Sequence, residues 1–282
     1  MSDPSIVRFR RVIGSAYANL EARRQEVNDL NVFPVADGDT GDNMAMTMRA
    51  VMEELDRLDG LEVDEVGRTQ LVQALARAAL MGARGNSGVI LSQIVRGAAE
   101  ELASRPGELV DPVLIGAAMA RASDRAYGSV REPAEGTMLT VVREMAHGIA
   151  SEIAHMDNPR LRERVDQETQ DALIAAVLER ALAAGEESVK RGPDLLSILR
   201  EAGVVDAGGY GLTIIIAGVI AALRGAEPPE LAHHAPARVT HPQHESATYR
   251  FCTNFAVEGE DLDPAGWIRP LEGLGDSVLV VG

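Results

Sequence analysis

The sequence predicts an all-α fold, an antiparallel up-and-down bundle of eight helices, followed by the start of an α/β or β domain. Hydrophobic residues form 46% of the 282 residues, whereas aromatic residues form only 3%. Such a composition favours closely packed helices over a β-sandwich. Between residues 4 and 224 the apolar residues recur three or four positions apart, which is the spacing of helices with one buried face.

The connections between the expected helices carry Gly, Pro or Asp, which interrupt regular structure. The apolar run at 212–223 is shorter than the roughly 20 residues that a membrane span requires, so we expect a buried helix there. In chain order the helices are marked by residues 6–17, 44–55, 71–79, 89–98, 113–127, 138–153, 173–182 and 211–223, with a short turn at 195–199.

The pattern changes after residue 225. Residues 226–246 carry four prolines and four histidines with little apolar periodicity, which is typical of a linker with solvated histidines. Beyond it, residues 249–255 alternate with a period of two, and residues 277–281 form a continuous β-rich run. We therefore expect a helical domain at 1–225 and the incomplete beginning of a second domain at 247–282, in a chain that is a fragment or a protein truncated inside its second domain.

Charge and composition exclude several classes of protein. The net charge of −16 argues against nucleic acid as a partner, because a phosphate backbone requires cationic patches. A single cysteine, Cys252, fits a reducing compartment, and residues 1–11 lack the apolar core of a signal peptide, so we expect a cytoplasmic location. Lys190 is the only lysine and lies in no glycine-rich turn. A P-loop and a protein kinase are excluded, because each needs a lysine beside the nucleotide.

The stretch at 31–44 contains three aspartates and two asparagines directly before the second helix. Asp37 and Asp39 are two positions apart, so in an extended loop both side chains leave on the same side, where they suit Mg²⁺ carrying nucleotide phosphates. Gly41 permits close backbone approach, and the helix starting near Asn43 is expected to offer free N–H groups to anions. Simple turn chemistry is the alternative. An EF-hand is excluded, because the sixth position of the loop is not glycine.

Three more glycine-containing loops stand directly before predicted helices. Together with the acidic loop they precede the second, fourth, sixth and eighth helix, and in an up-and-down bundle the even-numbered helices all begin at the same end. The four loops are therefore expected to converge on one rim, which favours a phosphate-binding site without a Walker lysine. The three loops comprise residues 82–88, 132–138 and 203–211.

Each of these three loops also has a purely structural explanation. In the loop at 82–88, Asn86 and Ser87 could cap the fourth helix and the glycines could simply form a tight turn. Thr137 and Asp206 are residue types that cap helices, and they stand before the sixth and eighth. The functional alternatives are a phosphate cradle in the loop at 82–88, a soft contact for a flat base at Met138, and a ribose hydroxyl or phosphate-bound water at Asp206. The residues alone leave both explanations open.

Four segments together resemble FakA, the ATP-binding subunit of bacterial fatty acid kinase, whose nucleotide-binding domain is similar to DhaL, the ATP-binding subunit of dihydroxyacetone kinase. The resemblance covers about residues 1–225, and residues 251–255 and 275–277 resemble the opening of the FakA middle domain. It implies an eight-helix barrel with Mg-ATP at one rim. The segments are NVFPVADGDTGDNM at 31–44, GARGNSGVILSQ at 82–93, EGTMLTV at 135–141 and GVVDAGGYGL at 203–212.

The resemblance implies that Asp37 and Asp39 bind one or two Mg²⁺ ions. Asn31 stands near the place of a third aspartate in DhaL domains, as a direct or water-mediated ligand. Asp42 departs from the threonine common in FakA-like proteins and adds negative charge near the phosphates. Arg84 is the candidate cation for charge that develops on the transferred phosphate, because no lysine can serve. The remaining nucleotide-binding positions implied are Thr40, Gly41, Asn43, Asn86, Ser87, Gly88, Met138, Asp206, Ala207 and Gly208.

The leading functional hypothesis is phosphoryl transfer from ATP to the carboxylate of a fatty acid, giving an acyl phosphate for phospholipid metabolism. The resemblance implies that a separate DegV-like protein presents the acid. One alternative is phosphorylation of dihydroxyacetone through a DhaK-like partner. The other is a non-catalytic nucleotide-binding regulator or scaffold, and a homodimer is left open. Cys252 matches a zinc-ligand cysteine whose histidine partners would lie beyond Gly282, so zinc is expected only in a longer chain. The fragment is expected to bind Mg-ADP or Mg-ATP but to turn over poorly.

Overall fold

The computed structural model describes residues 4–58, 67–106, 108–161, 165–237, 253, 255–275 and 278–282. Over these residues the chain is helical and contains no strand, which confirms the predicted all-α class. Eight long helices appear in the predicted order, accompanied by three short ones. The long helices are α1 (Pro4–Ala22), α3 (Thr40–Leu58), α4 (Arg68–Gly82), α5 (Gly85–Ser104), α6 (Pro112–Ser129), α7 (Met138–His155), α8 (Gln167–Leu195) and α10 (Ala207–Arg224), and the short ones are α2 (Arg24–Asn28), α9 (Ser197–Ala202) and α11 (Pro264–Glu272).

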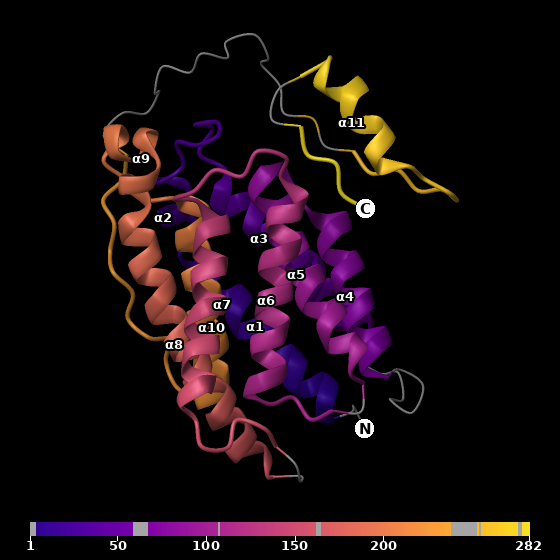
Figure 1. Cartoon of the computed structure of the whole chain (residues 1–282), viewed down its shortest axis with the longest axis vertical. Helices are drawn as coiled ribbons and strands as arrows, with labels where there is room; N and C mark the ends of the chain where they lie inside the picture. Colours follow the sequence, from indigo (N-terminus) through magenta and orange to yellow (C-terminus); the bar gives the residue numbers. More distant parts are fainter. Residues whose placement is uncertain are drawn as a thin grey trace.

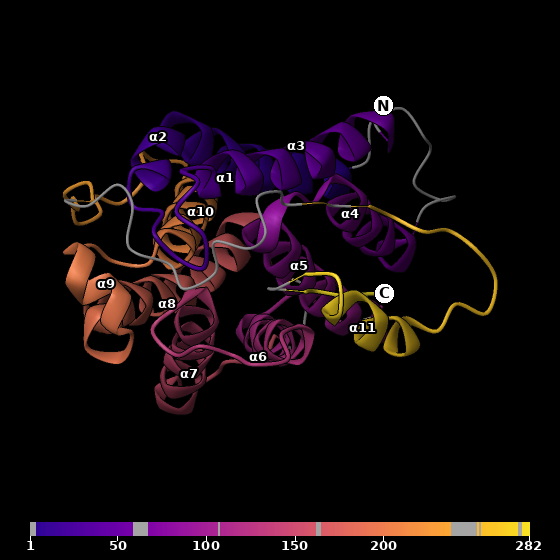
Figure 2. The same ribbon diagram turned by 90° about the horizontal axis from the view of Figure 1, so that it is seen from above.

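The long helices form a closed ring. Each packs against the next in chain order, and α10 returns to pack against α1. Helices α2 and α9 lie at the upper end of the barrel in Figure 1, whereas the N-terminus lies at the lower end. Figure 2 looks down on the upper end and shows the helices around the circuit. The architecture is therefore the expected antiparallel barrel, and the helices that begin at its upper end are α3, α5, α7 and α10.

The seam between α1 and α10 closes the ring because the two backbones come very near each other. A Cβ atom on Gly218 would lie 2.7 Å from both the Cα atom of Ala16 and the carbonyl oxygen of Ser15. The Ser15 hydroxyl donates to the carbonyl of Gly218 at 2.8 Å, and the Asn19 amide donates to the carbonyl of Ile214 at 2.7 Å. Glycine is thus needed at residue 218 for the barrel to close.

Side-chain caps fix where several helices start. Asp111 begins α6 by accepting the N–H of Leu114 at 2.8 Å, and Asp166 begins α8 by accepting the N–H of Thr169 at 2.8 Å. Helix α8 extends well beyond the predicted 173–182 at both ends. Its apolar periodicity marks only the middle turns, since many residues near its ends are exposed and polar.

Among the described helices, α10 alone is long and apolar enough to cross a membrane, but 78% of it is buried inside the barrel. It packs against α1, α8, α7 and α3. The prediction of a buried helix at 212–223 is confirmed, because the side chains that make the run apolar form the core of the barrel.

The chain after α10 turns back along the barrel. Residues 226–237 are part of the predicted linker, yet Leu231 is buried in the core, and the N–H of Ala237 donates to the carbonyl of Asp29 at 3.1 Å. Residues 278–281 form no strand, and α11 is the only helix in the described part of 253–282. Cys252, His241 and His244 lie outside the described residues. The boundaries of the second domain therefore stay a prediction.

Candidate functional site at the upper rim

The acidic loop, residues 31–39, leads from α2 into α3. The side-chain oxygen of Asn31 accepts the N–H of Gly38 at 2.7 Å and so folds the loop back on itself. Gly38 has a φ of +70°, which glycine adopts without strain. The Phe33–Pro34 peptide bond is cis. Asn31 is buried and shapes the turn that carries the two aspartates.

The side chains of Asp37 and Asp39 face each other closely enough to hydrogen-bond. Burial, that hydrogen bond and the negative charge of Asp39 together raise the pKa of Asp37 to about 6, from its usual 3.8. The carboxyl of Asp37 is partly desolvated by its surroundings, yet the residue as a whole is exposed at the surface and Asp39 is half-buried, so a ligand can reach the pair. A divalent cation would relieve the repulsion between the carboxylates, and their oxygen atoms are the hard donors that Mg²⁺ prefers.

The first turn of α3 is capped from α2. The side-chain oxygen of Asn28, thirteen residues before Gly41, accepts the N–H groups of Gly41 at 2.7 Å and Asp42 at 3.2 Å. The expectation that these N–H groups are free for an anion is therefore wrong. Gly41 is needed for a different reason, because a Cβ atom there would clash with the carbonyl oxygen of Arg24. No local pattern marks Asn28 as a cap, because an ordinary cap residue directly precedes its helix, whereas Asn28 lies thirteen residues before Gly41.

The extra negative charge at Asp42 is neutralised. The Arg24 guanidinium lies 3.0 Å from its carboxylate, so Asp42 points toward α2. Thr40 and Asn43, two of the predicted nucleotide positions, are both buried in the first turn of α3. The four loops of the rim are numbered in chain order, the acidic stretch at 31–44 being the first and residues 82–88, 132–138 and 203–211 the second, third and fourth. The Asn43 amide lies against Gly85 of the second loop, where a Cβ atom would clash with it, and Gly85 has a φ of +58°. Glycine at that position lets the first two loops meet.

The second loop starts α5 without a side-chain cap. Asn86 and Ser87 lie half-buried in the first turn and do not cap the helix, so the capping part of the structural explanation is wrong, whereas the tight turn is present at Gly85, whose φ is +58°. Gly88 is buried against α3, and a Cβ atom there would lie 2.8 Å from the hydroxyl of Thr47. The first N–H groups of α5 are therefore free of any side-chain cap, in contrast to the start of α3.

Arg84 is exposed and folds onto its own loop. Its guanidinium donates to the carbonyl of Ala83 at 2.7 Å and to that of Met81 at 3.3 Å. These are neutral acceptors, so the positive charge of Arg84 is not paired with a carboxylate among the described residues. Arg84 would have to leave these carbonyls to contact a phosphate.

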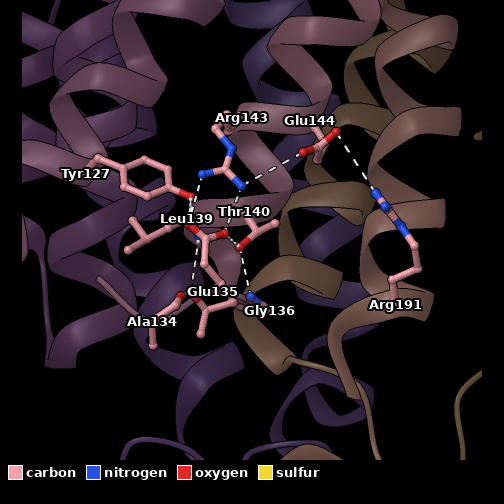
Figure 3. Close-up of polar contacts among 10 residues, drawn as sticks. Tyr127, Ala134, Glu135, Gly136, Leu139, Thr140, Arg143, Glu144 and Arg191 are labelled. Atoms are coloured by element: carbon pink, nitrogen blue, oxygen red, sulfur yellow. Dashed lines mark hydrogen bonds and ion pairs between the residues drawn. The ribbon is translucent and has the colours of Figure 1, made fainter. Parts of the chain in front are cut away.

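The third loop is held by a polar network around Glu135, shown in Figure 3. Both oxygen atoms of Glu135 accept from the Arg143 guanidinium at 2.8 Å, and the Thr140 hydroxyl donates to one of them at 2.7 Å. Tyr127 donates to the other at 3.1 Å, and its ring lies under the Arg143 guanidinium. The salt bridge to Arg143 lowers the pKa of Glu135. This network, which no sequence pattern indicated, fixes the turn at Gly136 just before α7.

The fourth loop is organised by Asp206. Its carboxylate accepts the N–H of Gly209 at 2.7 Å and caps α10, and the backbone of Met138 in the third loop also donates to it. Burial raises the pKa of Asp206 to about 6 even though these donors oppose the shift. Ala207 is buried beside it, and Gly208 packs against the Met138 side chain. The capping role of Asp206 is confirmed, and it ties two loops together.

Contacts join all four loops at one end of the barrel. The first and second meet at Asn43 and Gly85, and the third and fourth meet at Met138 and Gly208. The first and fourth meet where a Cβ atom on Gly211 would lie 2.6 Å from the sulfur of Met44. The convergence expected from helix parity is therefore confirmed, and every predicted site residue lies on or beside this rim.

The buried carboxyl of Asp206 should make stability depend on pH. Its pKa is raised in the folded protein, so it stabilises the fold below pH 3.8 and this contribution is lost as pH rises through about 6. We expect the stability of the wild type relative to Asp206→Asn to fall by roughly 1.4 kcal/mol for each pH unit across that window and to be flat above it. Denaturant unfolding of both proteins between pH 4 and 8 measures the difference, and a difference that rises with pH would contradict the burial of an ionisable carboxyl.

The barrel is similar in fold to part of a solved structure. The crystal structure of the dihydroxyacetone kinase of C. freundii superposes with a TM-score of 0.52 and 17% sequence identity, over 78% of this chain and 34% of that chain. An identity this low shows the fold alone. The protein is thus an all-α barrel of the type found in dihydroxyacetone kinase, with a polar rim built from four helix-start loops.

The DAK2 domain model matches residues 34–221, well over half of the chain. The chain belongs to the DAK2 domain family. Its relatives include Protein YloV of Bacillus subtilis, 34% identical over 290 residues, and the uncharacterized protein SSP1546 of Staphylococcus saprophyticus, 34% identical over 288 residues. Each match covers 97% of this chain and 48% of the relative. The chain therefore spans about half the length of the curated relatives it matches.

Proposed function

We propose that the upper rim binds Mg-ATP and that the chain is the ATP-binding part of a phosphotransferase. The observation that carries this proposal is the facing pair of carboxyl groups, Asp37 and Asp39, at the rim where the four loops meet. Membership of the DAK2 domain family and a barrel fold like that of dihydroxyacetone kinase support a kinase.

In this proposal Asp37 and Asp39 ligate one or two Mg²⁺ ions. Asn31 acts chiefly by shaping their loop, since its side-chain oxygen already accepts the N–H of Gly38, and it contacts the metal at most through water. The phosphates lie between the acidic loop and the uncapped first turn of α5, beside Thr40, Gly41, Asn43, Asn86, Ser87 and Gly88. The adenosine part lies where Met138 packs on the fourth loop, next to Asp206, Ala207 and Gly208.

The reaction in this site is an in-line displacement at the γ-phosphorus of ATP. An oxygen of the acceptor forms the new bond to phosphorus, and the bond from phosphorus to the bridging oxygen breaks and leaves ADP. Little covalent chemistry is asked of the protein, so its contribution is to position the phosphates and to neutralise charge. Arg84 is the proposed cation for the transferred group, because its side chain is exposed beside the uncapped turn of α5 and can exchange neutral carbonyl partners for a phosphate.

The finer proposal is that the acceptor is a fatty acid carboxylate presented by a DegV-like protein, which gives an acyl phosphate. The segments at 251–255 and 275–277 support it, since they resemble the FakA middle domain. Phosphorylation of dihydroxyacetone through a DhaK-like partner is the second candidate, favoured by the similarity in fold to dihydroxyacetone kinase. A cytoplasmic location and a zinc site that includes Cys252 in a longer chain belong to the same proposal.

Two measurements test the proposal in sequence. Isothermal titration of this chain with ADP, with and without Mg²⁺, should show binding that requires the metal, and no binding in either condition would refute the nucleotide site. The full-length protein is then incubated with ATP, a fatty acid and the DegV-like protein, and hydroxylamine traps any acyl phosphate. A product with dihydroxyacetone and a DhaK-like protein, in place of a trapped acyl phosphate, would favour the second candidate.

A further inference from the structure

The short helix α2, which no sequence pattern predicted, lies between two loops of the rim. On one side α2 fixes the first turn of α3, where the acidic loop ends, because Asn28 caps α3 and Arg24 pairs with Asp42. On the other side it contacts the start of α10. A displacement of α2 would therefore change the position of both loops, and above all of the turn that carries the two aspartates.

Tyr210 makes the contact from α10 to this region. Its hydroxyl accepts from the guanidinium of Arg23, next to α2, and donates to the carboxylate of Glu26 at 3.1 Å. Arg23 and Glu26 also form a direct ion pair at 2.8 Å, and the Arg23 guanidinium lies 5.3 Å from the centre of the Tyr210 ring. Burial raises the pKa of Tyr210 to about 12, so its hydroxyl keeps the proton that it donates. Tyr210 is 2% exposed and links α2 to the fourth loop.

The returning segment, residues 226–237, covers this cluster. The ring of His234 meets the ring of Tyr210 edge-on, with centroids 4.9 Å apart and an interplanar angle of 90°. His234 is half-buried, so the expectation that the linker histidines are solvated is wrong for this one, whereas His233 is exposed. The N–H of Ala232 donates to Glu186 of α8 at 3.3 Å, and that of Ala237 to the carbonyl of Asp29, directly after α2. The segment is thus fixed to α8 at Ala232, to Tyr210 of α10 at His234 and to the end of α2 at Ala237.

We propose that Tyr210 is a positioning residue for the metal–phosphate site, and that residues 226–237 regulate the site by holding Tyr210 and α2 in place through His234. This inference rests on the proposed function, because it names what controls that site. The chain passes along this segment on its way from the barrel to residue 253 and beyond. Moving residues 226–237 away from the barrel would release α2 and loosen the cap that Asn28 places on α3. The affinity of the acidic loop for its metal would then decrease.

The first test follows the cap directly and needs no nucleotide. Amide hydrogen exchange of the full chain reports on the N–H groups of Gly41 and Asp42, which Asn28 accepts. His234→Ala is expected to speed exchange at these two positions, and His234→Phe, which keeps an aromatic edge against Tyr210, is expected to restore the wild-type rate. His155→Ala, which removes an exposed histidine at the end of α7, is the matched control and should leave the exchange rates at Gly41 and Asp42 unchanged.

The second test measures the apparent affinity for Mg²⁺ at a saturating ADP concentration. His234→Ala should weaken it roughly threefold to tenfold, the factor that corresponds to one edge-to-face aromatic contact. Tyr210→Phe, which removes the hydroxyl bonds to Arg23 and Glu26, should weaken it as well. The double variant should lose less than the product of the two effects, because both substitutions interrupt the same link from residues 226–237 through Tyr210 to α2. A purely structural histidine would lower the melting temperature and leave the Mg²⁺ dependence unchanged.

The outcomes separate this inference from the proposed function. If the wild type binds Mg-ADP but His234→Ala leaves both hydrogen exchange and Mg²⁺ affinity at wild-type values, the regulatory role is overturned and the site stands. If the wild type shows no metal-dependent binding, the proposed function fails. The regulatory role of residues 226–237 then fails with it, even if hydrogen exchange shows that His234 and the cap on α3 are coupled. Faster exchange together with weaker Mg²⁺ binding in His234→Ala, rescued by His234→Phe, establishes the coupling.

Discussion

Replacing Asp37 or Asp39 by alanine is expected to abolish Mg²⁺-dependent nucleotide binding while leaving the nucleotide-free fold intact. The reason is electrostatic. Burial, the hydrogen bond to Asp39 and the negative charge of Asp39 raise the pKa of Asp37 to about 6, so at higher pH both carboxyl groups are ionised and repel each other. A carboxyl whose pKa is raised on folding stabilises the protein at low pH and loses that contribution as pH rises through 6. At pH 7.5 the pair therefore weakens the apo protein, and removing one member should leave its stability unchanged or slightly higher.

A structural aspartate should behave in the opposite way, and Asp111 provides the matched control. Asp111 caps α6 by accepting the N–H of Leu114 and is 3% exposed. Asp111→Ala should lower stability by roughly 0.5–2 kcal/mol through the missing cap and keep the full thermal shift with Mg-ADP. Thermal melts of all three variants, with and without Mg-ADP, give the comparison. The metal site would be disproved by Asp37→Ala and Asp39→Ala proteins that melt lower in apo form yet retain the whole ligand-induced shift.

The largest expected effect on the fold comes from Gly218→Val. The added side chain would meet the backbone of α1 at Ser15 and Ala16, and a backbone cannot move aside as a flexible side chain can. We expect a loss of about 3 kcal/mol, at the upper end of overpacking effects, and a decrease in melting temperature of roughly 6–12 °C. Nucleotide binding at the rim should weaken in parallel, because α10 carries the fourth loop at its start.

Gly14→Ala is the control for this substitution, since Gly14 lies in α1. A Cβ atom on Gly14 would lie 3.6 Å from the terminal methyl of Met52, an ordinary contact distance. The alanine should leave stability unchanged or raise it by up to about 1 kcal/mol through higher helix propensity. Differential scanning calorimetry of the two variants and the wild type measures these differences in melting temperature. A Gly218→Val protein as stable as the wild type would mean that α1 and α10 do not approach as closely as described.

Helices and their directions could be predicted because they depend on local, repeating features of the chain. Apolar spacing located all eight long helices, and helix parity alone predicted that the four loops would meet on one rim. The spacing failed at α2, because five residues are too few to show a period. It also underestimated α8, whose ends carry few apolar residues and are shaped by their capping residues.

At the candidate site, the residue types and their order were readable, but the partners of those residues were not. The sequence by itself determined an acidic pair suited to Mg²⁺, glycines at the loops, and the absence of a lysine for a P-loop. Only the tertiary structure decided that Asn28 caps α3, that Asp42 is neutralised by Arg24, and that Asn86 and Ser87 are not caps. It also decided that His234 packs on Tyr210. The physical reason is that chemistry resides in side chains, which the sequence names, whereas hydrogen bonds and ring contacts between distant segments exist only once the closed ring of helices has brought those segments together.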